Sequence, residues 1–168
     1  RPGSHDYNRS LLASIIAANG EEKAEEWASN LVLNLARKPE GNDRAQAKAV
    51  HEGVCDVAVM NTYYFGKMKF NEKNLEQKEW AKSINLIFTN QDNRGNHINV
   101  AGGGVVKYSK NKDNAIALLE FLTQPEAQVL YSKMNYEYPV NPNVEPSEEL
   151  SSWGVFIEDQ LAVERLAE

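Results

Sequence analysis

The chain of 168 residues is poor in several features that would narrow its function at once. It has one cysteine, Cys55, so no intrachain disulfide can form, and cysteine use leaves the compartment open. No apolar run approaches the ~20 residues that span a bilayer. Lysine and arginine are scattered rather than clustered, and the net charge is −6. We therefore expect neither a membrane-spanning protein nor a nucleic-acid-binding one, which would need a basic surface.

The residues that are present suit a folded domain. The hydrophobic fraction is 42%, enough for a packed core, and the length is within the usual range of one compact domain. The chain opens on Arg1-Pro2-Gly3-Ser4, without a starting methionine or a signal peptide. Because this start already lies inside a helix-capping sequence, we expect a mature segment or a fragment of something longer.

Apolar residues recur at helical or strand spacing along the chain, separated by turn residues. Ser4 is expected to cap a helix that runs to Asn19 and stops at Gly20. Further helices are expected at residues 21–35, 43–52, 63–70, 71–83, 112–122, 125–134 and 157–166. Strands are expected at residues 54–60, 84–89 and 97–106, with an extended segment at 136–142. This mixture of helices and strands predicts an α/β fold.

Two adjacent tyrosines, Tyr63 and Tyr64, follow the apolar run 54–60, and a third, Tyr7, lies near the expected start of the first helix. Phenolates are hard oxygen donors, which hard cations prefer over sulfur and imidazole. Two phenols at the start of one helix or strand, together with a third phenol from another element, would suit Fe(III). The dipeptide alone has a more common role in packing, because tyrosine buries its ring and leaves its hydroxyl hydrated.

The spacing of the pair restricts how its oxygens could meet. Successive helical residues point about 100° apart. We therefore expect Tyr63 to leave from a strand end and Tyr64 from a helix, with Asn61 and Thr62 capping the exposed amides between them. Tyrosinate ligands would neutralise the ferric charge and release protons on binding, so affinity should rise with pH.

Other residue types offer weaker candidate sites. The three histidines, His5, His51 and His97, lack the spacing of zinc motifs. We expect His5 to cap a helix or lie on the surface, and His51 to lie near a helix C-terminus. The run Gly102-Gly103-Gly104 has no Lys-Ser or Lys-Thr after it and is not a phosphate-binding loop.

Several segments, read together, resemble the periplasmic ferric-iron-binding proteins of ABC importers, a branch of the type II solute-binding fold. The resemblance covers nearly the whole chain. It rests on residues 1–11, 61–64, 97–105, 114–122, 125–128 and 136–142. The later segments are shared broadly among related solute-binding proteins, whereas the tyrosine pair and its spacing from Tyr7 are what point to iron.

The resemblance implies a periplasmic-binding-protein-like lobe, a mixed sheet flanked by helices, within a two-lobed protein about twice this length. Residues 1–89 would be the C-terminal-lobe segment that carries the tyrosines. Residues 90–141 would cross back to the other lobe, and residues 142–168 would return as C-terminal helices. The missing N-terminal lobe of the same protein would then supply further ligands.

The resemblance also implies roles for individual residues. Tyr63 and Tyr64 match the adjacent iron ligands of the family, and Tyr7 matches a third. Asn61, Ser4 and Asp43 match positions that contact an anion or surround the ligands. Members that bind phosphate have asparagine where Asp43 stands, and a carboxylate there would repel phosphate. We therefore expect carbonate or water as the additional ligand.

The function implied is capture of Fe(III) and its delivery to the membrane permease of an ABC importer, not catalysis. The protein would be periplasmic, or extracytoplasmic and lipid-anchored in a Gram-positive organism. Three other interpretations stay open. One is a lobe for an organic or anionic solute, such as a phosphonate, polyamine or thiamine-like molecule. Another is a metal-dependent hydrolase that uses His5 or His51. The third is a fragment unable to bind by itself.

Overall fold

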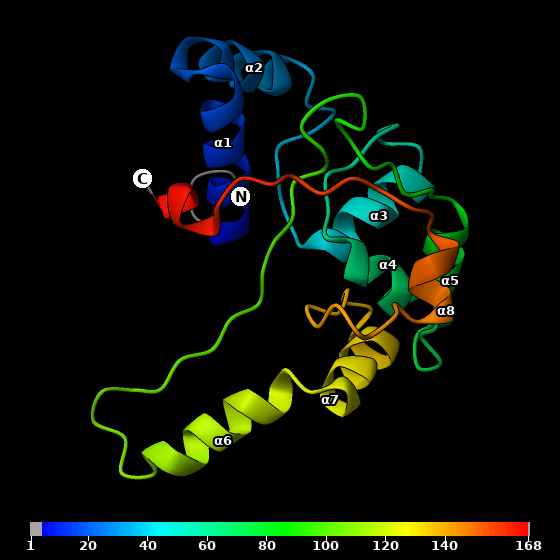
Figure 1. Cartoon of the computed structure of the whole chain (residues 1–168). Helices are drawn as coiled ribbons and strands as arrows, with labels where there is room; N and C mark the ends of the chain where they lie inside the picture. The colour runs from blue at the N-terminus through cyan, green and yellow to red at the C-terminus, as the bar shows by residue number, and fades with distance from the viewer. Residues whose placement is uncertain (1–4, 168) are drawn as a thin grey trace. The chain divides into compact units, whose positions relative to one another are not determined.

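The computed structural model describes residues 5–167, which are mainly helical (Figure 1). None of the helices in this range is long and apolar enough to cross a bilayer. The helices are α1 (Asp6–Asn19), α2 (Glu21–Leu33), α3 (Asp43–His51), α4 (Thr62–Lys69), α5 (Leu75–Lys82), α6 (Lys112–Leu122), α7 (Pro125–Leu130), the π-helix η1 (Tyr131–Asn135), α8 (Glu148–Ser152) and the 3₁₀-helix η2 (Val163–Ala167).

The chain divides into two compact units, and it passes from one to the other four times. Unit 1 comprises the described residues of Arg1–Ala58, Ile87–Asn99 and Phe156–Glu168. Unit 2 comprises Val59–Leu86 and Val100–Val155. The lobe boundaries expected from the family resemblance differ from these unit boundaries and stay a prediction.

In unit 1, α1 packs against α2 and η2. The helix begins after His5, whose Nδ1 accepts a hydrogen bond from the Tyr7 backbone N–H at 3.3 Å. This confirms the capping role expected for His5, whereas the cap expected at Ser4 lies outside the described residues. Gly20 ends the helix with a φ of 82°, a left-handed value that glycine adopts without a Cβ penalty.

Two segments of unit 1 that are distant in the sequence lie side by side. Asn96 donates its backbone N–H to the Ile157 carbonyl at 2.8 Å, and Asp159 donates its own to the Asn96 carbonyl at 2.8 Å. The Gln91 side-chain amide both donates to the Ile157 carbonyl and accepts from the Ile157 N–H. Gly95 is required here, because a Cβ on it would lie 2.6 Å from the carbonyl carbon of Glu158.

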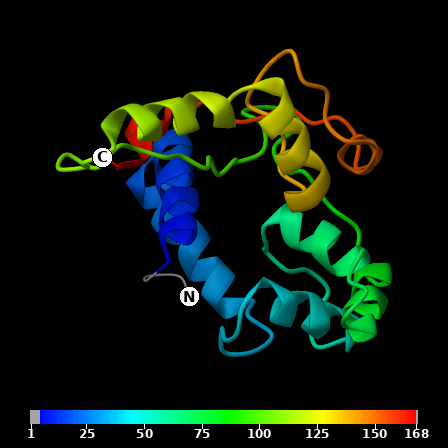
Figure 2. The same cartoon turned by 90° about the horizontal axis from the view of Figure 1, so that it is seen from below.

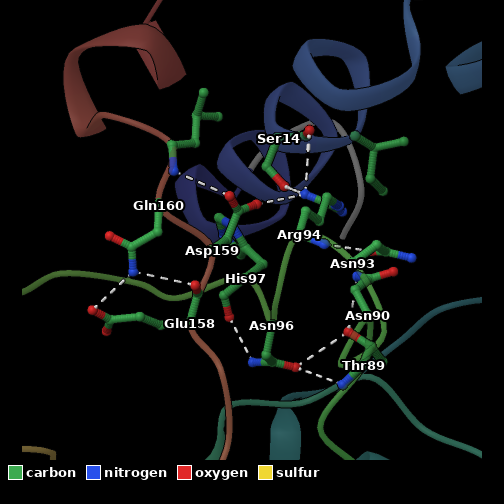
Figure 3. Close-up of polar contacts among 12 residues, drawn as sticks. Ser14, Thr89, Asn90, Asn93, Arg94, Asn96, His97, Glu158, Asp159 and Gln160 are labelled. Atoms are coloured by element: carbon green, nitrogen blue, oxygen red, sulfur yellow. Dashed lines mark hydrogen bonds and ion pairs between the residues drawn. The ribbon is translucent and has the colours of Figure 1, made fainter.

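Arg94 connects these two segments to each other and to α1 (Figure 3). Arg94 donates through Nη1 to Oδ2 of Asp159 at 2.6 Å and to the hydroxyl of Ser14 at 2.8 Å. The other oxygen of Asp159 accepts from the Leu161 N–H at 3.1 Å. Ser14 is buried on α1, so the guanidinium joins three segments of unit 1.

In unit 2, α4 packs against α5 and η1 (Figure 2). Met68 of α4 and Leu150 of α8 are fully buried. Lys69 forms an ion pair with Glu149 at 2.7 Å, which joins α4 to α8. Trp153 donates its indole N–H to the same carboxylate at 2.8 Å. The helix α4 is thus held on several sides within its unit.

The described residues do not form the expected mixed sheet. Segments 54–60, 84–89 and 97–106 do not pair as strands, and the only β pairing in residues 5–167 is the parallel bridge between Asn96 and Glu158. A ladder needs a neighbouring strand to satisfy each N–H and C=O group. No such neighbour runs beside these segments in the described chain, and their Val57, Val59 and Ile87 side chains are exposed.

The expected helix 157–166 is also wrong. Residues 157–159 run extended, because their backbone groups bond to Gln91 and Asn96 rather than to one another, and only η2 is helical. The helix α8 was not expected, although Ser147 followed by Glu148 and Glu149 is a helix-start signal. The other expected helices are confirmed to within a few residues, η1 extending α7 as a π-helix.

Candidate metal centre

Both tyrosines of the adjacent pair lie in the first turn of α4, which begins at Thr62. The expectation that Tyr63 leaves from a strand end is therefore wrong. Asn61 is the N-cap residue, but its side chain makes no capping hydrogen bond; its carbonyl accepts from the Tyr64 N–H at 3.2 Å. The ring centroids of Tyr63 and Tyr64 are 4.3 Å apart with the planes tilted by 32°, so the rings lie side by side.

The backbone of α4 supports this arrangement. Gly66 and Met68 are buried, and both follow the pair within one and a half turns of the helix. Tyr63 and Tyr64 are themselves only half-buried. The buried residues fix the helix in its unit, while the two phenol rings keep part of their surface accessible.

A lysine also contacts the pair. The ammonium of Lys67 lies 5.0 Å from the centroid of the Tyr63 ring, within the range of a cation–π interaction. Lys67 follows Tyr63 by four residues, which brings the two side chains to the same face of the helix. This contact was not expected from the sequence, although the spacing of the two residues on a helix indicates it.

Phenol oxygens are the candidate ligands of this site. Residues 5–167 contain no group of three or more histidine, cysteine, aspartate or glutamate side chains placed to hold a metal ion. Two adjacent phenols instead provide two hard donors suited to a trivalent cation, once each loses its proton.

The third expected ligand, Tyr7, lies in unit 1, whereas Tyr63 and Tyr64 belong to unit 2. Tyr7 is exposed in the first turn of α1, with its ring edge-on to His5 at 5.0 Å. Asp43 is the first residue of α3, also in unit 1. Ser4 lies outside the described residues. The ligand role of Tyr7 and the anion roles of Asn61, Ser4 and Asp43 stay predictions.

The remaining histidines take different positions. His51 ends α3 and is exposed, as expected for a residue near a helix C-terminus. His97 is half-buried in unit 1. Burial lowers the pKa of His97, an effect that the hydrogen bond with Asn99 and the charge of Asp159 only partly offset.

Unit 1 also contains an open cleft of about 400 Å³, with α1 on one side and residues 93–94 and 157–161 on the other. It is lined mainly by apolar atoms. Its cation, Arg94, already bonds to Asp159 and Ser14. The lining contains no tyrosine, so this cleft does not supply a phenol ligand.

Comparison with known proteins places the chain in a family. Residues 13–156 match the model of the bacterial extracellular solute-binding proteins. Iron uptake protein A1 of Synechocystis is 42% identical over 166 residues, which cover 99% of this chain and 46% of that protein.

Two solved structures are similar to this one over 99% of the chain. The ferric binding protein from Campylobacter jejuni is 45% identical, with a TM-score of 0.93 and 52% of that chain covered. A Trichodesmium protein in complex with iron and citrate ligands is 44% identical, with a TM-score of 0.92 and 52% of that chain covered. The fold therefore fits that of periplasmic ferric-binding proteins.

The chain spans about half the length of these relatives. Its match to the family model nevertheless extends over most of its residues, from the middle of α1 to the segment after α8. The chain belongs to the family of bacterial extracellular solute-binding proteins.

Proposed function

We propose that this chain binds Fe(III) through the phenolate oxygens of Tyr63 and Tyr64, as part of a protein that delivers iron to an ABC importer. The observation that carries the proposal is the side-by-side placement of the two rings in the first turn of α4. The names of the Synechocystis, Campylobacter and Trichodesmium relatives, which refer to iron uptake or ferric binding, support it. A binding role without catalysis agrees with the family.

We propose Tyr7 as a third phenolate ligand, on the strength of the family resemblance. Three phenolates would balance the ferric charge but would leave an octahedral ion short of donors. A small oxygen ligand, carbonate or water, would complete the shell near Asn61, Ser4 and Asp43. The Trichodesmium structure contains citrate with its iron, so a carboxylate anion is a further candidate for the same position.

The partners proposed are a membrane permease and a polypeptide equivalent to the other half of the relatives. Exposed apolar side chains support the second. The helix α6 has no buried residue, and its Ile116, Leu118 and Phe121 are exposed. Apolar surface of this kind is stabilised by burial against another part of a protein. Periplasmic location, or lipid anchoring outside the cytoplasm, is proposed with the function.

A visible absorption titration with ferric citrate tests the proposal. Wild-type protein should develop a phenolate-to-iron charge-transfer band, and Tyr63→Phe and Tyr64→Phe should each weaken it. Tyr7→Phe tests the third ligand in the same way. Tyr108→Phe is the matched control, because Tyr108 also has a lysine ammonium over its ring, at 5.4 Å, but is 83% exposed and far from the pair in the sequence.

The outcomes distinguish iron binding from the binding of another solute. A band that weakens in both variants of the pair and persists in Tyr108→Phe supports the proposal. Wild-type protein that stays colourless and retains no iron after dialysis contradicts it. Thermal stabilisation of that colourless protein by a phosphonate, a polyamine or thiamine would instead favour an organic or anionic solute.

A further inference from the structure

We propose that Lys67 is a positioning residue for iron binding: its ammonium holds the ring of Tyr63 in place beside that of Tyr64. This inference rests on the proposed function, because it assigns Lys67 a role only if Tyr63 is a ligand. It adds a cation to a site whose other proposed members are oxygen donors and polar neighbours.

The contact follows from the helix. Tyr63 and Lys67 are four residues apart on α4, so their side chains lie on one face. The Lys67 ammonium is 5.0 Å from the Tyr63 ring centroid, and both residues are half-buried. A contact of this kind is worth about 0.5–1 kcal/mol where water still reaches it.

The other cation near the end of α4 has a different role. Lys69 forms an ion pair with Glu149 at 2.7 Å, and its ammonium lies over the rings of Phe65 and Phe70. Lys67 forms no ion pair with a carboxylate among the described residues, so its charge is not neutralised by a salt bridge there. The charge of Lys67 therefore acts on the phenol ring, while that of Lys69 joins two helices.

A ring held by a contact loses less conformational freedom on binding a metal than a ring that rotates freely. The cation–π contact is present in the metal-free protein, so the Tyr63 ring is already partly ordered before the ion arrives, and preorganisation of this kind raises affinity. Lys67 thus favours iron binding through the position of the ring.

Three variants test the role. Lys67→Met keeps most of the side-chain length and removes the charge, and Lys67→Arg keeps the charge. Lys73→Met removes a positive charge from an exposed turn of the same unit and controls for net charge. Ferric affinity is measured by competition with citrate at low and high salt. The Tyr63 ring is followed by NMR of ¹³C-labelled tyrosine, its signal being the one that Tyr63→Phe removes.

The expected result has three parts. Lys67→Met shifts the Tyr63 ring signal in the metal-free protein and weakens ferric binding about two- to fivefold at low salt. High salt reduces the difference in ferric affinity between Lys67→Met and the wild type, because it screens a half-exposed charge. Lys67→Arg and Lys73→Met bind as the wild type does.

Two results would overturn the inference while leaving the proposed function intact. One is wild-type affinity in Lys67→Met, with the charge-transfer band unchanged. The other is a loss in Lys67→Arg as large as in Lys67→Met, which would indicate packing rather than charge. Wild-type protein with no ferric binding at all would overturn the proposed function, and the role of Lys67 with it.

Discussion

Gly66 lies directly against the ring of Tyr136: a Cβ on Gly66 would stand 2.3 Å from Cγ of that ring. Tyr136 adopts a left-handed φ of 59°, which is uncommon for a residue other than glycine, and its ring stacks on Phe70. The close approach of the ring to the helix backbone is possible only without a side chain at position 66. The helix that carries the tyrosine pair is positioned in part by this contact.

Gly66→Ala should lower the free energy of unfolding by about 1–3 kcal/mol, because the added methyl overpacks the ring contact. An alanine in a helix would otherwise be favourable by about 1 kcal/mol relative to glycine, so a loss identifies the clash. Urea denaturation measures it. Gly102→Ala is the control, since nothing lies within 4 Å of a Cβ there. Equal stability of Gly66→Ala and wild type would show that Tyr136 moves aside at little cost.

Arg94→Met should destabilise the protein by about 2–4 kcal/mol, because it leaves the Asp159 carboxylate buried without its partner. The side chains of Arg94 and Asp159 are only 21% and 10% exposed. The control is the pair Lys82–Glu79, whose side chains are 70% and 59% exposed. Lys82→Met should change the free energy of unfolding by about 1 kcal/mol or less.

The double variant Arg94→Met/Asp159→Asn separates the pair interaction from the other contacts of each residue. It should be more stable than Arg94→Met alone, since the unpaired charge is removed as well. If Arg94→Met and Lys82→Met lower stability equally, Arg94 does not hold residues 156–161 and α1 together.

His97 should make the protein less stable in acid. Burial lowers the pKa of His97 below its ordinary value of 6.5, even though the hydrogen bond with Asn99 and the charge of Asp159 raise it, and the charge of Arg94 lowers it further. Between the folded pKa and about pH 6.5, the unfolded chain therefore binds more protons than the folded protein does. The free energy of unfolding falls as pH drops from about 6.5 through the folded pKa.

Urea denaturation at pH 7 and pH 5 checks this expectation. His97→Gln removes the titrating group, so it should lose less stability between the two pH values than the wild type does. A loss in His97→Gln as large as that of the wild type would assign the acid sensitivity to other groups.

Asn42→Ala should cost about 1 kcal/mol, because Oδ1 of Asn42 caps α3 by accepting from the Ala45 N–H at 3.2 Å. Asn111 precedes α6 in the same position, but its side chain makes no capping bond. Asn111→Ala should therefore cost less, and the difference between the two variants by chemical denaturation measures the cap. An equal loss of stability in Asn42→Ala and Asn111→Ala would contradict the capping role of Asn42.

Local signals in the sequence predicted the helices well and the strands badly. Gly20 and Pro125 mark helix ends that the structure confirms, because backbone preferences of glycine and proline act within a few residues. The apolar run 54–60 indicates a tendency to be buried but not the neighbour that would pair with it. The strand expected at residues 54–60 therefore does not form among the described residues.

The amino-acid identities alone define the type of donor and its spacing, because Tyr63 and Tyr64 are adjacent and each carries a hard phenol oxygen. Three features depend on the folded chain: both rings leave from one helix turn, Gly66 receives the Tyr136 ring, and Arg94 reaches Ser14 across 80 residues of sequence. Contacts between distant segments depend on the joint packing of many side chains from different parts of the chain. Helix caps and the chemistry of a residue depend only on that residue and its near neighbours in the sequence.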